Sequence, residues 1–382
     1  MNILHIGKYY PPFHGGIENF MNALIEQQIA EGHSVSAMVH HHHKTEHFYK
    51  DSIGGANIYR VPIIGNIAYA PIAPSFLFRI GQILKKENPD IIHIHTPNLS
   101  AFWCLFVLAA RKKKWVIQWQ SDVLGAVPDI KIKMLYPLYR FFESALLRKS
   151  SKVIVATPPY AKTSKPLNKF KDKVEVIPLG IVGKKHENIV QSTMSNDSTI
   201  ELLIIGRLTY YKGHSVLLNA LYLLNRNNIA INLTIIGSGE LNDVIKQQVA
   251  ELGLQENVQM LGKLSHEELE KELIKTDLLC LPSIERTEAF GVVLLEAMRA
   301  SKACLVSDVE GSGMSWVVED NKTGFVVKHN DVNSLVERLT YIADNPSLLT
   351  KYGKAGRVRF EQHFLIENVS QKVTQLYKSI LT

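Results

Sequence analysis

The sequence of 382 residues contains no run of eighteen consecutive apolar residues, so it predicts no membrane-spanning helix. Its first residues lead directly into an apolar segment without a basic region or a cleavage site, and we therefore expect no secretory signal. Cysteine is scarce, and Cys104, Cys280 and Cys304 all lie in apolar segments without the spacing of metal ligands. This usage is typical of reduced core residues, and we expect a cytoplasmic protein.

The chain also lacks any recognised RNA- or DNA-binding motif, although its formal net charge is +7. Such an excess of cations suits a nucleic acid, an anionic membrane surface or an anionic substrate. Without a motif the first of these is the weakest, so we expect no nucleic-acid partner. The length and the hydrophobic content of 46% indicate a globular chain with two domains of ordinary size.

Apolar strand-like runs alternate with helix-like runs from end to end, which predicts an α/β fold with parallel sheets covered by helices on both faces. We predict strands near residues 3–6, 35–39, 58–61, 91–94, 115–119, 153–156 and 174–177, and again near 202–205, 233–236, 258–261, 278–281, 304–307 and 325–327. Residues 181–198 are polar and resemble a linker. We therefore expect two doubly wound, Rossmann-like domains, residues 1–182 and 183–362, with a helix over 363–382 that packs back on the first. Ligands of such sheets bind at the carboxyl ends of strands, so we expect a site in a cleft between the domains.

The most informative segment is residues 278–298, where a buried strand, a polar loop and an amphipathic helix follow one another. The helix begins near Phe290 and Gly291, with Glu288 before it and Glu296 inside it. Free N–H groups at a helix start suit a phosphate, and a nearby carboxylate suits sugar hydroxyls. The alternative is a solvated capping glutamate and a glutamate on the helix surface.

Three other predicted strands of the second half end in similar loops. Arg207 and Lys212 follow the strand 202–205 and are expected to converge on an anion. Gly237 and Gly239, after the strand 233–236, allow close approach to a ribose or a base. Leu264 follows the strand 258–261 and is expected to offer backbone groups to a base edge.

In the first half, Gly15 and Gly16 end the loop after the first strand and precede a helix, which suits a diphosphate. A plain tight turn is the alternative, and the dinucleotide-binding pattern G-x-G-x-x-G is absent from this loop.

Two polar residues of the first half are candidates for contact with a sugar or an acceptor. His93 and His95 share one face of a strand, and we expect His95, which lies nearer the strand end, to reach the cleft. A core histidine is the alternative. Gln120 ends the strand 115–119 in the same way. Residues 40–43 are four adjacent histidines, which cannot all face one ion, so we expect an exposed loop and no metal.

Basic and aromatic residues alternate over residues 131–149, as in helices that rest on anionic lipid headgroups. A core helix with a solvated cationic face is the alternative. We expect a cytoplasmic protein that is peripheral on the inner face of the plasma membrane.

Glu288 and Glu296 match the E-x7-E motif of the retaining GT-B glycosyltransferases of family 4. Gly15-Gly16, Leu179-Gly180 and the segments 206–213 and 236–240 resemble the same family in the same order, over essentially the whole chain. Residues 118–123 resemble bacterial surface-polysaccharide members that transfer mannose or rhamnose.

The resemblance implies roles for individual residues. Gly16, Arg207 and Lys212 would bind the donor diphosphate, Glu296 the ribose, Glu288 the donor sugar, and the Phe290 and Gly291 N–H groups the phosphate and sugar. Relatives commonly carry a histidine where this chain has Gln120, which cannot take a proton. No Asp-x-Asp motif stands at a strand end, so we expect a metal-independent reaction without a cofactor.

The resemblance thus implies a GT-B enzyme that transfers a hexosyl unit from a nucleoside-diphosphate sugar to a lipid-linked glycan acceptor in surface-polysaccharide synthesis. Within the same fold, a sugar-nucleotide epimerase or a glycan phosphorylase is an alternative. A non-catalytic polyanion-binding protein is an alternative of another class.

Overall fold

The computed structural model describes residues 1–13, 15–43, 45, 47–67, 70–123, 130–183 and 199–382, so most of the expected linker, 184–198, lies outside the described residues. The chain forms two compact units: Met1–Val182 together with Ile366–Thr382, and Gly183–Leu365. We call them unit 1 and unit 2. The helix that returns to unit 1 was expected from residue 363, but that residue ends α12 (Ser347–His363), and the returning helix α13 runs over Ile366–Leu381. Within the described residues, no helix has the length and apolar character needed to cross a bilayer.

Unit 1 contains an eight-stranded sheet in the order β10-β9-β8-β7-β1-β2-β4-β3. Its strands are β1 (Asn2–Ile6), β2 (Ser34–His40), β3 (Tyr49–Ile53), β4 (Ala56–Val61), β7 (Ile91–Thr96), β8 (Lys114–Trp119), β9 (Lys152–Val155) and β10 (Val174–Val176). Seven of them coincide with the predicted strands and pair in parallel. The eighth, β3, is a polar edge strand antiparallel to β4, and its sequence YKDSI carries no apolar run to reveal it. A separate hairpin joins β5 (Gly65–Ile67) and β6 (Ala70–Ile72).

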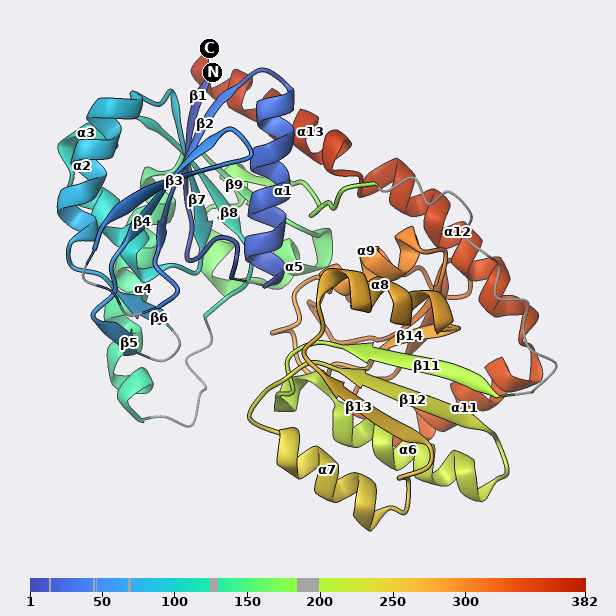
Figure 1. Cartoon of the computed structure of the whole chain (residues 1–382). Helices are drawn as coiled ribbons and strands as arrows, with labels where there is room; N and C mark the ends of the chain where they lie inside the picture. Colours follow the sequence, from blue (N-terminus) through green and yellow to red (C-terminus); the bar gives the residue numbers. More distant parts are fainter. Residues whose placement is uncertain (14, 44, 46, 68–69, 124–129, 184–198) are drawn as a thin grey trace. The chain divides into compact units, whose positions relative to one another are not determined.

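Helices cover both faces of this sheet (Figure 1). They are α1 (Gly16–Ala30), α5 (Pro158–Thr163) and α13 on one face, with α2 (Phe76–Glu87), α3 (Leu108–Arg111) and α4 (Ile130–Lys149) on the other. Short 3-10 helices η1 (Leu99–Leu105), η2 (Lys165–Lys169) and η3 (Lys171–Lys173) complete the unit. α13 packs beside α1, and the Tyr377 hydroxyl accepts from Nε2 of Gln28. Val369, Val373 and Tyr377 are spaced four residues apart and form one buried stripe of α13.

Unit 2 contains a six-stranded, all-parallel sheet in the order β13-β12-β11-β14-β15-β16. Its strands are β11 (Ile200–Ile205), β12 (Ile231–Ile236), β13 (Val258–Gly262), β14 (Leu278–Leu281), β15 (Ala303–Ser307) and β16 (Gly324–Val327), as predicted. Its helices are η4 (Tyr210–Lys212), α6 (His214–Arg226), α7 (Asn242–Glu251), α8 (His266–Lys275), α9 (Val292–Arg299), α10 (Met314–Val317), α11 (Val332–Asp344) and α12. Because the chain moves outward in one direction from β11 to β13 and in the other from β14 to β16, the strand order reverses between β11 and β14. Ligands of doubly wound sheets bind at such a point.

Strands of unit 2 are buried on both faces, because α6, α7 and α11 lie on one face of the sheet and α8 and α9 on the other (Figure 1). All four residues of β14 are inaccessible to solvent, which explains its continuous apolar sequence. Cys104, Cys280 and Cys304 are buried and free, and burial raises the pKa of each thiol. They are core residues, as predicted.

Candidate active site

The loops that follow β11, β12, β14 and β15 meet at the carboxyl end of the unit 2 sheet. Backbone hydrogen bonds join them in pairs: Leu208 N to Ser238 O at 3.1 Å, Ile284 N to Tyr211 O at 2.8 Å, and Gly313 N to Ala289 O at 2.8 Å. The loop after β12 is also joined to the end of β13, because Gly237 N donates to Gly262 O at 2.8 Å. Leu264 lies two residues further on, partly buried. Apart from Glu296, which lies inside α9, the predicted site residues of the second half therefore lie in adjacent loops or where those loops begin.

Two glycines permit this close packing. Gly237 has a φ of 143°, and a side chain there would overlap the Gly206 carbonyl oxygen. A side chain at Gly239 would likewise overlap the Leu208 carbonyl. Both glycines were predicted to let a ligand approach, but the contacts that require them in this structure are with the neighbouring loop. Their contact with a ribose or a base stays a prediction.

Lys212 and Glu288 form an ion pair between the loops after β11 and β14. Their side chains are only 10% and 13% exposed, so the pair is largely removed from water. Ser312 supports it, because its hydroxyl donates to the Glu288 carbonyl oxygen. Burial and the charge of Glu288 raise the pKa of the adjacent Tyr211 to about 12. The cation and the carboxylate predicted from separate motifs are thus in direct contact.

Arg207 leaves the same strand as Lys212 but is exposed. Its positive charge helps to lower the pKa of Glu240, after hydrogen bonds from that residue's own backbone N–H and from the Thr209 hydroxyl. The β11 loop therefore presents one solvated and one nearly buried cation.

Helix α9 begins directly beside this ion pair. Gly291 is its N-cap, in the left-handed conformation with a φ of 77°, and provides no side-chain cap. The first N–H groups of α9 are therefore not satisfied by a capping side chain, as suits an anion. Phe290 is buried, with its ring edge against Phe364 at a centroid distance of 6.1 Å. The predicted helix start at these two residues is confirmed.

Glu296 lies in the second turn of α9 and is partly exposed. Burial of the carboxylate raises its pKa, and the charge of Glu270 adds to this effect while Arg299 opposes it. Arg299 itself pairs with Glu270 at 3.2 Å. The Glu296 carboxylate therefore lies near the Arg299–Glu270 ion pair.

In unit 1, Gly15 caps α1 without a side-chain hydrogen bond, and Gly16 is exposed at the helix start. Gln120 follows β8, and its backbone N–H donates to Thr96 O at 3.1 Å. The Gln120 side chain is 8% exposed, and its Nε2 has no hydrogen-bond partner among the described residues. It is therefore a buried donor at a strand end.

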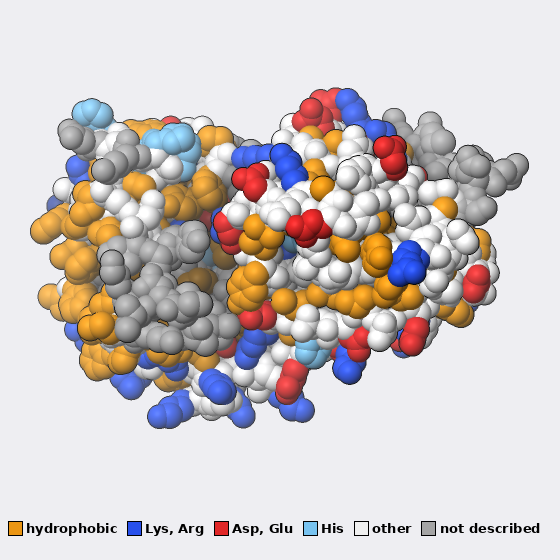
Figure 2. Space-filling view, turned by 90° about the horizontal axis from the view of Figure 1, so that it is seen from below, with side chains coloured by type: hydrophobic (Ala, Val, Ile, Leu, Met, Phe, Trp, Pro, Cys, Tyr) orange, Lys and Arg blue, Asp and Glu red, His pale blue; other side chains and the backbone are white. Residues whose placement is uncertain are grey.

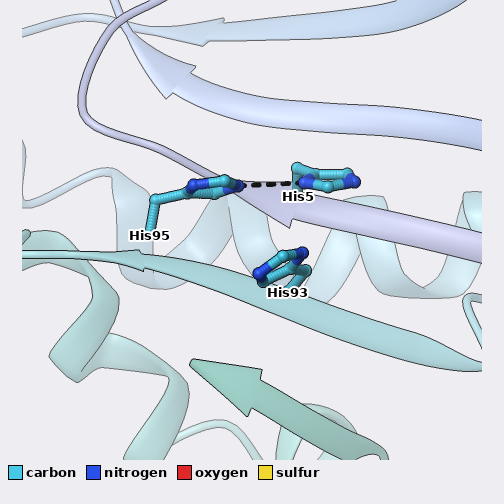
Figure 3. Close-up of side chains that lie close together, drawn as sticks. All are labelled: His5, His93 and His95. Carbon is cyan, nitrogen blue, oxygen red and sulfur yellow. Dashed lines mark hydrogen bonds between the residues drawn. The ribbon is translucent and has the colours of Figure 1, made fainter. Parts of the chain in front are cut away.

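Two histidine predictions are wrong. His95 does not reach the edge of the sheet: it is 1% exposed, and its Nε2 lies 3.0 Å from Nδ1 of His5 (Figure 3). β7 continues to Thr96, and its alternation directs His93 and His95 toward the layer of α1 and α13. His40 is not part of an exposed loop either, because it ends β2 and bonds to Lys8 O and the Ser100 hydroxyl.

Two sequence families together account for nearly the whole chain. Residues 15–180 match the Glycosyl transferase 4-like domain, and residues 185–359 match the Glycosyl transferases group 1. The chain is a glycosyltransferase, with one of these two families in each half. It is 29% identical to O-antigen chain mannosyltransferase C of Escherichia coli, over 100% of this chain and 99% of that protein. It is 26% identical to D-rhamnosyltransferase WbpZ of Pseudomonas aeruginosa, over 95% and 92% of the two chains.

Solved glycosyltransferase structures share the GT-B fold. Sucrose-phosphate synthase from Thermosynechococcus elongatus superimposes with a TM-score of 0.79 at 21% identity, over 99% of this chain and 98% of that chain. HepE of Anabaena, solved in complex with UDP and glucose, gives a TM-score of 0.72 at 17% identity, over 99% and 100%. The expected α/β GT-B fold is confirmed.

Sequence reasoning missed Ser312 and Gly313, which hold the Glu288–Ala289 segment of this glycosyltransferase from the β15 loop. The signal was present as Gly311-Ser312-Gly313, a glycine-rich turn after a predicted strand. It was not recognised because it adds no charged group.

Proposed function

We propose that this glycosyltransferase transfers a hexosyl unit from a nucleoside-diphosphate sugar to a glycan acceptor, with retention of anomeric configuration. The observation that carries the proposal is the Lys212–Glu288 ion pair, which lies where the strand order reverses and beside the start of α9. An ammonium, uncapped helix N–H groups and a carboxylate are the groups that a sugar diphosphate needs. The names of the mannosyl- and rhamnosyltransferase relatives favour a mannose or 6-deoxyhexose unit in surface polysaccharide.

Unit 2 would bind the donor. Lys212, Arg207 and the N–H groups of Phe290 and Gly291 would hold the diphosphate. Lys212 then exchanges Glu288 for phosphate oxygens, which frees the carboxylate to accept hydrogen bonds from donor-sugar hydroxyls. Glu296 would bind the ribose hydroxyls, and backbone groups near Gly237, Gly239 and Leu264 would contact the base.

The chemistry follows from where charge develops. As the glycosidic C–O bond breaks, negative charge grows on the departing nucleoside diphosphate. Preorganised cations and helix N–H groups stabilise that charge, so a divalent ion is not needed at the diphosphate. Gln120 would position the sugar or the acceptor as a hydrogen-bond donor, and the leaving phosphate would take the acceptor's proton.

Unit 1 would bind a lipid-linked acceptor at a membrane surface. Five large apolar side chains are exposed on α4, on α3 and at the C-cap of η1, and we call them the apolar patch: Phe106 (57% exposed), Leu108 (71%), Met134 (77%), Leu138 (55%) and Phe141 (67%). Stacking of Phe142 on Phe102, with ring centroids 5.7 Å apart, holds α4 against η1. An apolar face of this kind beside cations suits the headgroup region of a bilayer.

Cations gather at one end of the apolar patch. The pKa of Lys149 is lowered by burial and by the charges of Arg111 and Lys114, which places these side chains close together. The space-filling view shows hydrophobic side chains gathered on one face of unit 1, with lysine and arginine side chains along a margin (Figure 2). The side chains of Lys131 and Lys133 lie outside the described residues. α4 is buried on its other side at Glu143, Leu146 and Leu147, so the core-helix alternative accounts for that side alone.

The transfer proposal is tested with purified protein, GDP-, dTDP- and UDP-hexoses and a lipid-linked acceptor, with the product's anomeric configuration read by NMR. Retention of the donor's configuration is expected. An inverted product would overturn the retaining mechanism. Release of free sugar and nucleotide without any acceptor, or strict dependence on inorganic phosphate, would favour the epimerase or the phosphorylase.

Membrane association is tested by pelleting with phosphatidylglycerol or phosphatidylcholine vesicles. We expect pelleting with the anionic vesicles alone, weakened by salt. The Leu138→Ser/Phe141→Ser variant should lose most of it. Val244→Ser, at a 57% exposed position of α7 in unit 2, is the matched control and should pellet like wild type. Equal pelleting of all three proteins would overturn the membrane assignment.

A further inference from the structure

Three histidines of unit 1 lie with their rings together in the core (Figure 3). His5 belongs to β1, and His93 and His95 belong to the adjacent strand β7. Each is at most 1% exposed, and one ring nitrogen from each lies within 4.8 Å of the other two. We call this group the histidine trio. The transferase chemistry proposed above makes no use of it.

The spacing of the rings matches that of ligands around one metal ion. The ring centroids lie 4.9 Å apart for His5–His93, 5.3 Å for His5–His95 and 4.7 Å for His93–His95. Imidazoles that bind a tetrahedral zinc ion through nitrogens about 2.0 Å from the metal have centroids about 5 Å apart. An ion can therefore be accommodated with small rotations of the rings.

Hydrogen bonds orient two of the rings from outside the trio. Nε2 of His5 lies 2.8 Å from Oε1 of Gln28, and because an amide oxygen only accepts, this Nε2 carries the proton. The lone pair of His5 is then on Nδ1, which faces His95. Nδ1 of His93 lies 2.5 Å from the Tyr377 hydroxyl on α13. Outer partners of this kind are typical of metal-binding histidines, where they fix the tautomer and the ring orientation.

Without an ion, the hydrogen-bonding capacity of the histidine trio is incompletely used. Nδ1 of His95 is buried and has no hydrogen-bond partner in the described part of the chain. His93 has the Gln118 amide beside it in addition to Tyr377. An unpaired polar atom in a core is unfavourable, and the great majority of such atoms find a partner.

We propose that His5, His93 and His95 form a binding site for a zinc-class divalent ion. Imidazole nitrogen is a preferred ligand of Zn²⁺ and Co²⁺, whereas Mg²⁺ and Ca²⁺ need oxygen ligands, which the trio does not offer. The ion would act structurally, by joining β1 and β7 to α1 through Gln28 and to α13 through Tyr377. It is separate from the donor site, which lies in unit 2.

The test uses the full chain without an affinity tag, in a background carrying His41→Gln, His42→Gln and His43→Gln. These partly or fully exposed histidines could bind metal by themselves, since the rings of His42 and His43 are 4.1 Å apart. The protein is produced in cobalt-supplemented medium and dialysed. We expect about one equivalent of Co²⁺ per chain with the intense visible absorption of a tetrahedral site.

The variant His93→Gln/His95→Gln in that background should lose both the metal and the absorption. His40→Gln, which changes a buried histidine with ordinary partners in the same unit, should keep them. Absorption that persists in the double variant, or a background protein without bound metal, would overturn the proposal. If the double variant does not fold, X-ray absorption on the zinc-loaded background protein decides, and fewer than three imidazole ligands overturns the site.

Discussion

Replacing Lys212 by methionine removes the ammonium and keeps most of the side-chain volume. A fully buried ion pair that loses one partner costs about 3–5 kcal/mol, and an exposed pair about 0–1 kcal/mol. With side chains 10% and 13% exposed, the Lys212–Glu288 pair lies near the buried limit. We therefore expect Lys212→Met to lower the free energy of unfolding by about 2–4 kcal/mol. Glu288→Gln should have an effect of the same sign, because it leaves the Lys212 ammonium largely buried without its partner.

The double variant Lys212→Met/Glu288→Gln separates the two roles of Lys212. It leaves no unpaired charge, so its unfolding free energy should recover, with a coupling of about 1–3 kcal/mol between the two sites. Its transfer rate should not recover. Loss of a charge-assisted contact to phosphate, about 1.5–3 kcal/mol, lowers kcat/KM roughly ten- to a hundredfold in both Lys212 variants.

The measurements are urea unfolding and initial transfer rates for the four proteins of the cycle. Lys275→Met is the matched control, since Lys275 pairs with Glu272 at a surface position where the lysine is 68% exposed. It should change neither quantity appreciably. A double variant that regains the wild-type rate would show that Lys212 only neutralises Glu288, and the diphosphate assignment would fail. If the effects of the two single substitutions on the unfolding free energy simply add in the double variant, the ion pair is refuted.

Further outcomes follow from the same structure. Burial lowers the pKa of His40 and of His214 from 6.5 to about 4, so each contributes stability that is complete above pH 6.5 and lost as the pH falls toward 4. The loss is on the order of 3 kcal/mol per histidine, and the urea midpoint of His214→Leu should depend less on pH between 7 and 4.5 than that of wild type. Gln120→Ala should lower the transfer rate about two- to twelvefold, because one hydrogen bond is lost. Gln120→His should give no gain in rate between pH 6 and 8. A tenfold gain for Gln120→His, with a new ionisation in its pH–rate profile, would mean that the reaction uses a base at this position. Protein dialysed against EDTA should transfer sugar at the same rate with and without added Mg²⁺ or Mn²⁺, because Arg207 and Lys212 supply the positive charge at the diphosphate. A transfer rate that is restored only by these ions would contradict a metal-independent reaction.

The parallel strands were predictable because burial on both faces requires a continuous apolar run, as at Leu278–Leu281. β3 escaped prediction because a polar edge strand has no such signal. His95 was misplaced because alternation shows that two residues share a face but not which layer covers that face. The Lys212–Glu288 contact joins loops from two strands that are adjacent in the sheet but distant in sequence. Its members were recognised from separate local motifs, and the contact itself depends on strand order.

The return of α13 to unit 1 has a consequence for synthesis on the ribosome. Unit 2 is in effect an insertion within unit 1, because Ile366–Thr382 is translated after all of it. Until then the stripe of α1 that α13 covers is open to water, and His93 lacks the Tyr377 hydroxyl. A nascent chain can therefore complete unit 2 first, although unit 1 begins to emerge earlier. Emergence of α13 from the ribosome would then complete the core of unit 1.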